Sequence, residues 1–442
     1  MVTYNTVLRG ENMKNSNNIK WRKLDNSAKI FPMSTGQKYS SVFRLSVVLN
    51  NKVNPKILYE ALLSALEKYE IFKVRMKAGL FWYYLEENTK APIIEEENEY
   101  PCKYINPKAN NGYLFKVTYF KNKINIDIFH ALTDGNGGNV FFRELVYTYL
   151  EMCHPRDLKQ EIRRPRKIEY TEEDSYIKNY SKKIKTKSKN ERAYELKGKK
   201  IRLGAISTIH QIIDLEKLKI ECSKYDATVT QYLTAVLMYA IYNTNYTENK
   251  GKKPLKICVP VNLKKYFPSK TLSNFFSYII LAAKFKNNNL SNFDEMIEFV
   301  KKEFKERLTE EEVLKVMSSN VKLGNNFFIK IIPLFLKNIL VRIGYLEIRK
   351  HSTITYSNIG RIGILGDYQK YIKYFIMLIA PDPVEKIKCS SCTFENKIVF
   401  TFTSILNDNK IERVFYEFLI NKGIDVTIES NGVLDDISRK IK

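Results

Sequence analysis

Cysteine is scarce in this sequence, and long apolar runs are missing from it. Six cysteines among 442 residues are too few for a disulfide-framed secreted fold. The opening stretch is polar and rich in asparagine, without the charged-then-apolar order of a signal peptide. A membrane-spanning helix needs a run of about 20 apolar residues, and the nearest candidate, 327–346, contains a proline and three cations. These absences favour a soluble protein of the reducing cytoplasm.

Acidic residues are also in deficit. The chain has 73 Lys and Arg against 48 Asp and Glu, a formal net charge of +25. Such a balance favours anionic partners, namely phosphorylated small molecules, anionic membrane surfaces or nucleic acid. The charge is dispersed and lysine and asparagine are abundant throughout, so codon bias explains the excess equally well. No nucleic-acid-binding motif accompanies the charge, and we therefore expect no nucleic-acid partner.

What the sequence does contain is the pattern of a globular α/β (α+β) protein in two halves. Hydrophobic residues make up 44% of the chain, and the length is too great for one ordinary core. In the first half, residues 41–49, 114–120 and 123–129 read as strands. Asn54 followed by Pro55 predicts the start of an amphipathic helix, and 140–152 predicts a second.

The second half repeats this alternation of strands and helices after a charged stretch that lacks apolar periodicity. A strand is predicted at 202–213, Asp214 can cap the next helix, and Thr228 to Gln231 has the spacing of a capping box. We therefore predict an N-terminal lobe at 1–165, a crossover linker at 166–200 and a C-terminal lobe at 201–442. Further strands are predicted at 255–261, 275–285, 353–356, 375–379 and 398–406, and helices at 293–308, 327–346 and 411–422.

Two other patterns have a structural and a functional interpretation. The helix at 327–346, apolar with spaced cations, resembles an interfacial helix, but a core helix that lines a tunnel has the same pattern. We favour core packing and keep peripheral membrane contact as the alternative. Cys389 and Cys392 have the CxxC spacing of redox and zinc sites, yet no second pair accompanies them. We expect structural or incidental cysteines in a strand or hairpin, and no metal site.

One constellation points to chemistry. His130 follows the strand at 123–129 and precedes a turn containing Asp134, Gly135, Gly137 and Gly138. A neutral histidine there could accept a proton from an attacking hydroxyl. Asp134 could brace the loop, and the glycines would permit unusual backbone angles and close approach of a substrate. A single histidine at a strand end is usually structural, but this turn distinguishes it from the other three histidines, His154, His210 and His351.

The sequence from His130 to Gly135 matches the HxxxDG motif of the chloramphenicol acetyltransferase-like, or condensation-domain, superfamily. Five further segments resemble family motifs in their order and spacing, and the resemblance extends over nearly the whole chain. Within the superfamily the chain is most similar to bacterial alcohol O-acetyltransferases. The segments are FPMS at 31–34, YEIFK at 69–73, VPVNLK at 259–264, TLSNFF at 271–276 and YSNIG at 356–360.

The resemblance implies two acetyltransferase-like lobes that form a pseudo-dimer around a central tunnel. An acyl-CoA co-substrate would enter from one side and an alcohol or amine acceptor from the other, with no further cofactor and no metal. His130 would be the general base, and Asp134 and Gly135 would be structural. The tunnel candidates are Asn274, Ser357 and Lys264.

Two positions depart from the family pattern. Condensation domains usually carry a second histidine where this chain has Phe129, which argues against a peptide-synthetase module. Relatives often have arginine in place of Lys264, and lysine lacks the bidentate geometry with which arginine braces an aspartate. Two alternatives within the fold are a non-catalytic binding or scaffold protein and an enzyme that uses a carrier-protein thioester. A basic nucleic-acid-binding protein is the rival outside it.

Overall fold

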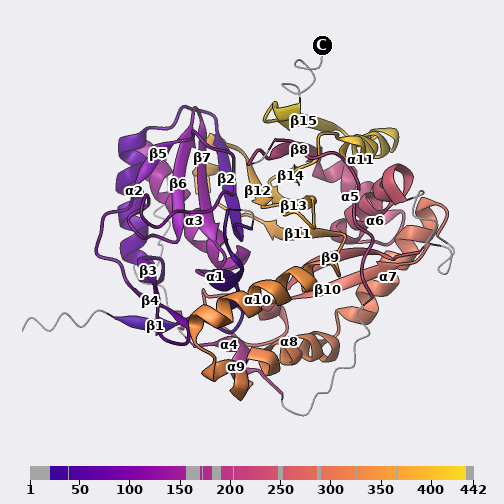
Figure 1. Cartoon of the computed structure of the whole chain (residues 1–442). Coiled ribbons are helices and arrows are strands. Elements are labelled where there is room, and N and C mark those ends of the chain that lie inside the picture. Colours follow the sequence, from indigo (N-terminus) through magenta and orange to yellow (C-terminus); the bar gives the residue numbers. More distant parts are fainter. Residues whose placement is uncertain are drawn as a thin grey trace, which may run out of the picture.

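The computed structural model describes most of the chain. The described residues are 20–37, 39–155, 170–171, 173–181, 191–202, 204–246, 252–285, 290–324, 326–364 and 366–434. Of the crossover linker predicted at 166–200, only residues 170–171, 173–181 and 191–200 are described. The lobe boundaries therefore remain a prediction. Two lobes lie side by side, each with a β-sheet and helices packed on it (Figure 1).

The first lobe is a five-stranded sheet covered by two helices. Its strands, in spatial order, are β12 (Ile372–Ile379), β2 (Val42–Leu49), β7 (Lys123–Phe129), β6 (Phe115–Phe120) and β5 (Ile94–Glu96). The strands predicted at 41–49, 114–120 and 123–129 are confirmed as β2, β6 and β7. Helix α2 (Pro55–Lys68) begins as predicted, because the Asn54 side chain accepts hydrogen bonds from two backbone amides and proline occupies the first turn. Helix α3 (Gly135–Cys153) packs beside it.

The second lobe is a seven-stranded sheet. Its strands, in spatial order, are β10 (Phe276–Ala283), β9 (Leu255–Asn262), β11 (Ile354–Arg361), β13 (Ile387–Phe394), β14 (Lys397–Ser404), β8 (Ser207–Asp214) and β15 (Val426–Ser430). Four helices belong to this lobe: α5 (Leu215–Ser223), α6 (Val229–Ile241), α7 (Phe293–Arg307) and α11 (Lys410–Asn421). The predicted capping box at Thr228 is confirmed at the start of α6. The buried faces of these elements form one apolar core.

Strand β12 connects the lobes. It follows β11 in the sequence, yet it pairs antiparallel with β2 of the first lobe along most of its length. Its side chains Phe375 and Met377 lie in the apolar core of that lobe. The first sheet is therefore completed by residues from the last quarter of the chain.

Smaller elements surround the junction of the lobes. A three-stranded sheet has the order β1 (Trp21–Lys23), β4 (Tyr83–Glu87) and β3 (Val74–Ala78). The helices here are α1 (Ile30–Ser34), α4 (Ser175–Lys178), α8 (Glu310–Gly324), α9 (Phe327–Ile331) and α10 (Leu334–Arg349). Short 3-10 turns occur at η1 (Glu70–Phe72), η4 (Leu263–Lys265) and η5 (Gly366–Tyr371), and a π turn at η2 (Tyr242–Tyr246).

The helix predicted at 327–346 differs from the expectation in two ways. Pro333 divides it into α9 and α10, because proline lacks an N–H and disfavours helical geometry in the residue before it. The preference for core packing is also wrong, since only Leu334 and Lys337 of α10 are buried. Among the described residues, no helix is both long enough and apolar enough to cross a membrane.

Candidate active site

The predicted motif lies where the first lobe meets the loop that precedes β10. Asp134 is the N-cap of α3, and its Oδ1 accepts hydrogen bonds from the backbone amides of Asn136 and Gly137, both at 3.0 Å. Its Oδ2 accepts from the amide of Phe275 at 2.9 Å. One buried carboxylate thus holds the helix start of one lobe against a loop of the other.

The glycines after Asp134 belong to the first turn of α3 and not to a separate turn, which corrects the sequence interpretation. None of Gly135, Gly137 and Gly138 has a positive φ. A Cβ on Gly137 would lie 2.1 Å from Thr133 Oγ1 and 2.3 Å from the carbonyl oxygen of Leu272. Glycine is therefore required here by the close approach of the 271–275 loop, and not by unusual backbone angles.

His130 follows β7, and its ring lies among aromatic side chains. It stacks on Phe31 of α1 with ring centroids 4.5 Å apart, and it contacts Phe43 and Phe276 at 5.5 and 5.2 Å. Desolvation in this setting lowers the pKa of His130, and the nearby charge of Asp134 opposes the shift only in part. The imidazole is consequently neutral at physiological pH, and the residue remains half-buried instead of fully enclosed.

Asn274 fixes which ring nitrogen carries the proton. Its Nδ2 donates to the carboxylate of Asp25 and to the backbone carbonyl of His130, both at 3.0 Å. Its Oδ1 is thereby the atom 2.9 Å from His130 Nδ1, and an amide oxygen can only accept. Nδ1 must hence carry the hydrogen of the neutral ring, which leaves the lone pair on Nε2.

Asp25 is a member of this cluster that the sequence analysis missed. Its carboxylate accepts from the amide of Ala28 at 2.7 Å and from the amide and side chain of Asn274 at 3.2 and 3.0 Å. Burial raises the pKa of Asp25 to about 7, and these hydrogen bonds offset the effect only partly. Asp25 lies 249 residues from Asn274 in the sequence, so no local pattern could have revealed the contact.

The other predicted residues, Lys264, Gly135 and Ser357, contact different parts of this site or none of it. Lys264 does not bond Asp134; its ammonium group donates to the carbonyl of Thr271, at the start of the loop that carries Asn274. A Cβ on Gly135 would lie 3.2 Å from Ile359, which brings the 356–360 segment beside the start of α3. Ser357 lies on β11, half-buried, and forms no hydrogen bond with His130, Asp134 or Asn274.

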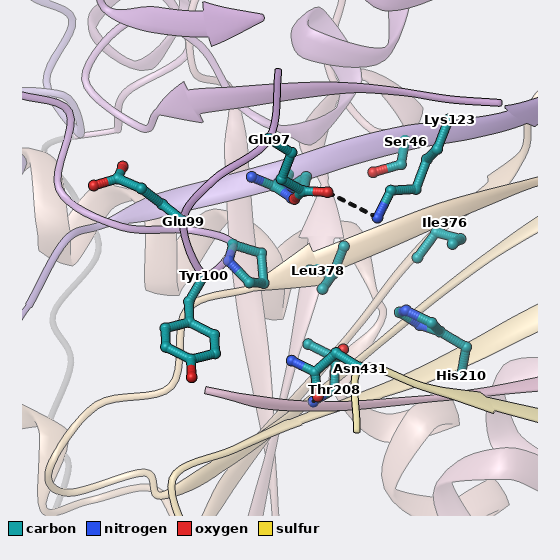
Figure 2. A pocket seen from close by; sticks show the side chains of 12 residues that line it. Ser46, Glu97, Glu99, Tyr100, Lys123, Thr208, His210, Ile376, Leu378 and Asn431 are labelled. Carbon is teal, nitrogen blue, oxygen red and sulfur yellow. Dashed lines mark hydrogen bonds and ion pairs between the residues drawn. The ribbon is translucent and has the colours of Figure 1, made fainter. Parts of the chain in front are cut away.

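A cavity of about 160 Å³ lies elsewhere between the lobes, beside β2 and β8 (Figure 2). Its cations are already paired, because Lys123 lies 3.1 Å from Glu97 and Arg44 lies 2.6 Å from Asp127. Burial lowers the pKa of His210 on its wall to about 3. The cavity therefore offers neither an unpaired charge nor a group that titrates near neutrality.

The CxxC cysteines lie in β13, as expected, with both thiols unpaired. Cys389 packs in the core of the second lobe and Cys392 in that of the first, so the two thiols face opposite sides of the sheet. Within the described residues, no three histidine, cysteine or acidic side chains are placed to hold a metal ion.

Comparison with known proteins gives both a family match and structural relatives. Residues 155–361 match the alcohol acetyltransferase family, and no curated protein matches the chain. The TRI3 trichothecene 15-O-acetyltransferase of Fusarium sporotrichioides has a similar structure, with a TM-score of 0.62 at 8% identity over 91% of this chain and 95% of that one.

Two further structures share the fold. The TRI101 protein of F. sporotrichioides, solved with coenzyme A and T-2, has a TM-score of 0.59 at 10% identity and covers 92% of this chain and 99% of that one. The starter condensation domain of rhizomide synthetase, solved with C8-CoA and Leu-SNAC, has a TM-score of 0.58 at 10% identity, covering 91% and 93%. The predicted resemblance is confirmed: residues 155–361 match the alcohol acetyltransferase family, and the chain shares its fold with acetyltransferases and a condensation domain.

Proposed function

We propose that this protein transfers an acyl group from acyl-CoA to an alcohol, with His130 as the general base. The observation that carries the proposal is the fixed tautomer of His130, a neutral ring whose Nε2 lone pair is left for a substrate. The family match at 155–361 supports acyl transfer to an alcohol, and structural relatives were solved with coenzyme A. An amine acceptor would use the same base.

The proposed reaction is a direct attack without an acylated protein residue. Nε2 of His130 takes the hydroxyl proton while the alcohol oxygen bonds to the thioester carbonyl carbon. The C–S bond then breaks, and the leaving thiolate receives the proton from the imidazolium, so that the products are an ester and free CoA thiol. Nδ1–H stays bonded to Asn274 throughout, which holds the ring in orientation.

Asp134, Gly135 and Lys264 have supporting roles in this proposal. Asp134 holds α3 against the 271–275 loop, and Lys264 bonds the carbonyl of Thr271 in that loop, so both act through the position of Asn274. Gly135 lets Ile359 of the 356–360 segment approach the start of α3. None of the three transfers a proton in this proposal. Ser357, on the neighbouring β11, is proposed only as a polar contact for the acceptor in the tunnel between the lobes.

Product analysis of a mixed panel tests this function. The protein is incubated with acyl-CoA donors of several chain lengths and a set of alcohols and amines, and the esters and amides are identified by mass spectrometry. His130→Ala should fold normally and lose about two to four decades of turnover, the contribution of a positioned general base. Asn243→Ala, at an exposed position in η2, is the matched control and should retain full turnover.

Other results would separate the alternatives. Turnover of His130→Ala within a few-fold of the unsubstituted protein, with an unchanged melting curve, would remove His130 from the mechanism. Transfer from an acyl carrier protein but from no acyl-CoA would change the donor. Binding of acyl-CoA without any product would indicate a non-catalytic member of the fold.

A further inference from the structure

Helix α10 presents its apolar side to solvent, the reverse of an ordinary surface helix. The apolar face, as we name it, consists of exposed side chains spaced so that they share one stripe of the helix. Phe335, Ile339 and Ile343 are 66%, 57% and 62% exposed. The opposite side carries the two buried residues, Leu334 and Lys337. The complete face is Phe335, Leu336, Ile339, Leu340 and Ile343.

The helix is held firmly in this orientation at its first turn. Lys337 is almost completely buried; its ammonium group donates to the carbonyl of Phe81 at 2.8 Å and lies 3.5 Å from the centre of the Trp82 ring. The amide of Leu334 donates to the carbonyl of Leu80 at 2.9 Å. The tip of the β3–β4 hairpin thus lies beside the first turn of α10, and Leu80 is itself largely exposed.

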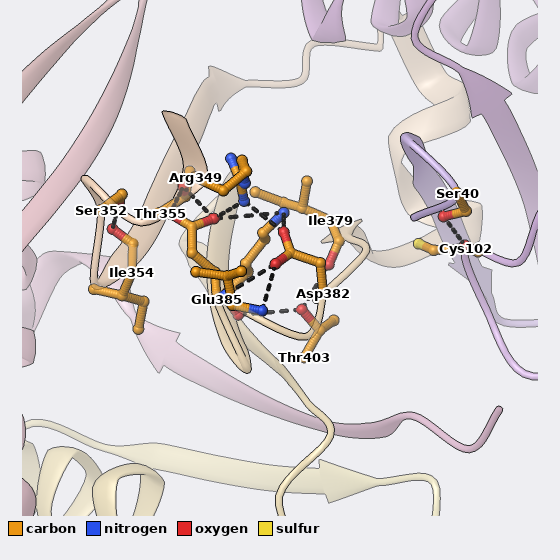
Figure 3. A network of polar contacts seen from close by, with 12 residues as sticks. Ser40, Cys102, Arg349, Ser352, Ile354, Thr355, Ile379, Asp382, Glu385 and Thr403 are labelled. Atoms are coloured by element: carbon orange, nitrogen blue, oxygen red, sulfur yellow. Dashed lines mark hydrogen bonds and ion pairs between the residues drawn. The ribbon is translucent and has the colours of Figure 1, made fainter. Parts of the chain in front are cut away.

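The other end of α10 is anchored by buried charges. Arg349 lies 2.7 Å from Asp382 and also bonds Glu385, which accepts from Thr355 at 3.0 Å (Figure 3). Lys388 lies 3.1 Å from the same Asp382. One end of the helix is fixed by a buried lysine and the other by an arginine bound to buried carboxylates. It therefore cannot rotate to bury its apolar side, and its exposure is a property of the fold.

The charge around the apolar face is mostly positive, and the acidic residue one turn beyond Ile343, Glu347, is paired with Arg192 and Lys350. Between residues 313 and 346 the sequence has five cations and no acidic residue. Lys322, Lys330 and Arg342 of this stretch are exposed. An apolar stripe with cations beside it is the pattern of helices that lie in the interface of an anionic bilayer.

We propose that α10 and the tip of the β3–β4 hairpin form a docking surface for an anionic lipid bilayer. A second copy of the chain fits less well, because two surfaces of the same positive sign repel each other. A stable protein interface also needs about 20–30 residues on each side, whereas the apolar face has five. A bilayer needs no such area, because the helix buries its apolar side about 5–10 Å into the interface.

This surface lies one helix away from the candidate active site. Figure 1 shows α10 crossing the front of the molecule, and it packs against α1. Phe31 of α1 stacks on His130 at 4.5 Å. Docking through α10 would therefore place the His130 end of the lobe junction close to the lipid surface, where sparingly soluble molecules accumulate.

Vesicle co-sedimentation of the full chain tests the proposal. Vesicles of phosphatidylcholine alone are compared with vesicles that also contain phosphatidylglycerol, at low and high salt. We expect stronger binding to the anionic vesicles, weakened by salt. The chain has two tryptophans, Trp21 of β1 and Trp82 at the hairpin tip, so we also expect a blue shift of tryptophan fluorescence on binding.

A matched pair of substitutions distinguishes binding through the apolar face from nonspecific hydrophobic adsorption. Ile343→Asp should lower the partition coefficient about tenfold or more, because it places a charge in the buried side of the docked helix. Ile220→Asp adds the same charge to α5, where the isoleucine is 65% exposed, and should leave binding unchanged. Arg342→Gln should reduce the preference for phosphatidylglycerol, and Lys219→Gln on α5 should not.

Three results would overturn the proposal. They are no binding to either vesicle, equal loss of binding in Ile343→Asp and Ile220→Asp, and a dimer in sedimentation velocity that Ile343→Asp dissociates. The last of these would assign the apolar face to self-association. Because vesicle binding requires no turnover, these outcomes are independent of whether the protein proves to be an acyltransferase.

Discussion

Asn274 connects the carboxylate of Asp25 to the imidazole of His130. Asp25 accepts one hydrogen bond from the side-chain amide of Asn274 and one from its backbone N–H, and these bonds hold the amide in the position that orients the ring. Asp25 has a raised pKa of about 7, so the folded protein holds a proton there that the unfolded chain loses near pH 4. Stability from this group is therefore present at low pH and is lost as pH rises towards 7, by about 1.4 kcal/mol per pH unit at most.

Asp25→Asn should remove this slope. We expect the melting temperature of the variant to depend less on pH between about 4 and 7. Its turnover should fall, because the side-chain NH2 group of the new asparagine would face the N–H donors of Asn274. Glu412→Gln is the control: burial also raises the pKa of Glu412, to about 8, but it lies on α11, away from His130. That variant should lose its own slope and keep its turnover. Identical pH profiles for Asp25→Asn and the unsubstituted protein would contradict the assigned protonation.

Asp134→Asn should lower both stability and rate. The carboxylate accepts three backbone hydrogen bonds. Asparagine would turn its side-chain NH2 group, which is a donor, towards the N–H of Phe275, which is also a donor. We expect a loss of about 1–3 kcal/mol in the free energy of unfolding, measured by denaturant titration. Asp214→Asn, which caps α5 through Lys217, is the control and should cost less without changing turnover. Lost activity with an unchanged unfolding curve would instead assign Asp134 a direct chemical role.

At the scale of elements, the start of α3 is determined by contact with another lobe. Gly137→Ala raises helix propensity by up to about 1 kcal/mol, yet its Cβ would overlap Thr133 and Leu272. We expect net destabilisation and reduced turnover, because the 271–275 loop must move and Asn274 with it. Gly344→Ala in α10, where nothing lies within 4 Å of the added Cβ, should stabilise the protein by up to about 1 kcal/mol. Thermal melts of the two variants give the comparison, and equal shifts would contradict the steric argument.

The contrast between these glycines also shows what the sequence could predict. Helix α2 and strand β7 follow local rules, a cap with proline and a strict alternation, and both were predicted closely. The three glycines predicted a turn because glycine has a low helix propensity. In the structure they lie in α3, and the contact of Gly137 with a distant segment outweighs that propensity. The apolar pattern at 327–346 predicted a helix, but the preference for core packing was wrong, because periodicity does not say whether an apolar stripe faces protein or solvent.

The site itself was predictable only in part. The HxxxDG motif and the 271–276 segment identified His130, Asp134 and Asn274, and the structure brings these three together. Asp25 was missed because Asn274, its partner here, is distant in sequence. The sequence placed Lys264 where relatives often have an arginine that braces the aspartate, but it did not reveal that Lys264 bonds Thr271. Local spacing therefore located the residues of the first lobe, while contacts between segments decided how they are oriented.

For the whole molecule, the net charge of +25 has a testable meaning. If the phosphates of CoA are held by surface cations, the affinity for a nonhydrolysable acyl-CoA analogue should fall as salt rises, since exposed charges are screened beyond about 8 Å at physiological ionic strength. Lys265→Ala, exposed beside the backbone-bonded Lys264, should weaken binding, and Lys219→Ala on α5 should not. Calorimetry at two salt concentrations measures both. Affinity independent of salt would leave codon bias as the explanation of the charge.

The crossing of β12 into the first sheet affects how the chain is made. While the protein is being synthesised, β2 lies at an open sheet edge until its neighbour is produced roughly 320 residues later. At about 5–20 residues per second this interval is on the order of 15 seconds to a minute. The sheet of the first lobe thus lacks its edge strand until nearly the whole chain has been synthesised. During that time the unpaired edge of β2, eight residues that are buried in the folded protein, is a template for aggregation. Of the two lobes, the one that is synthesised first is completed only after most of the other has emerged.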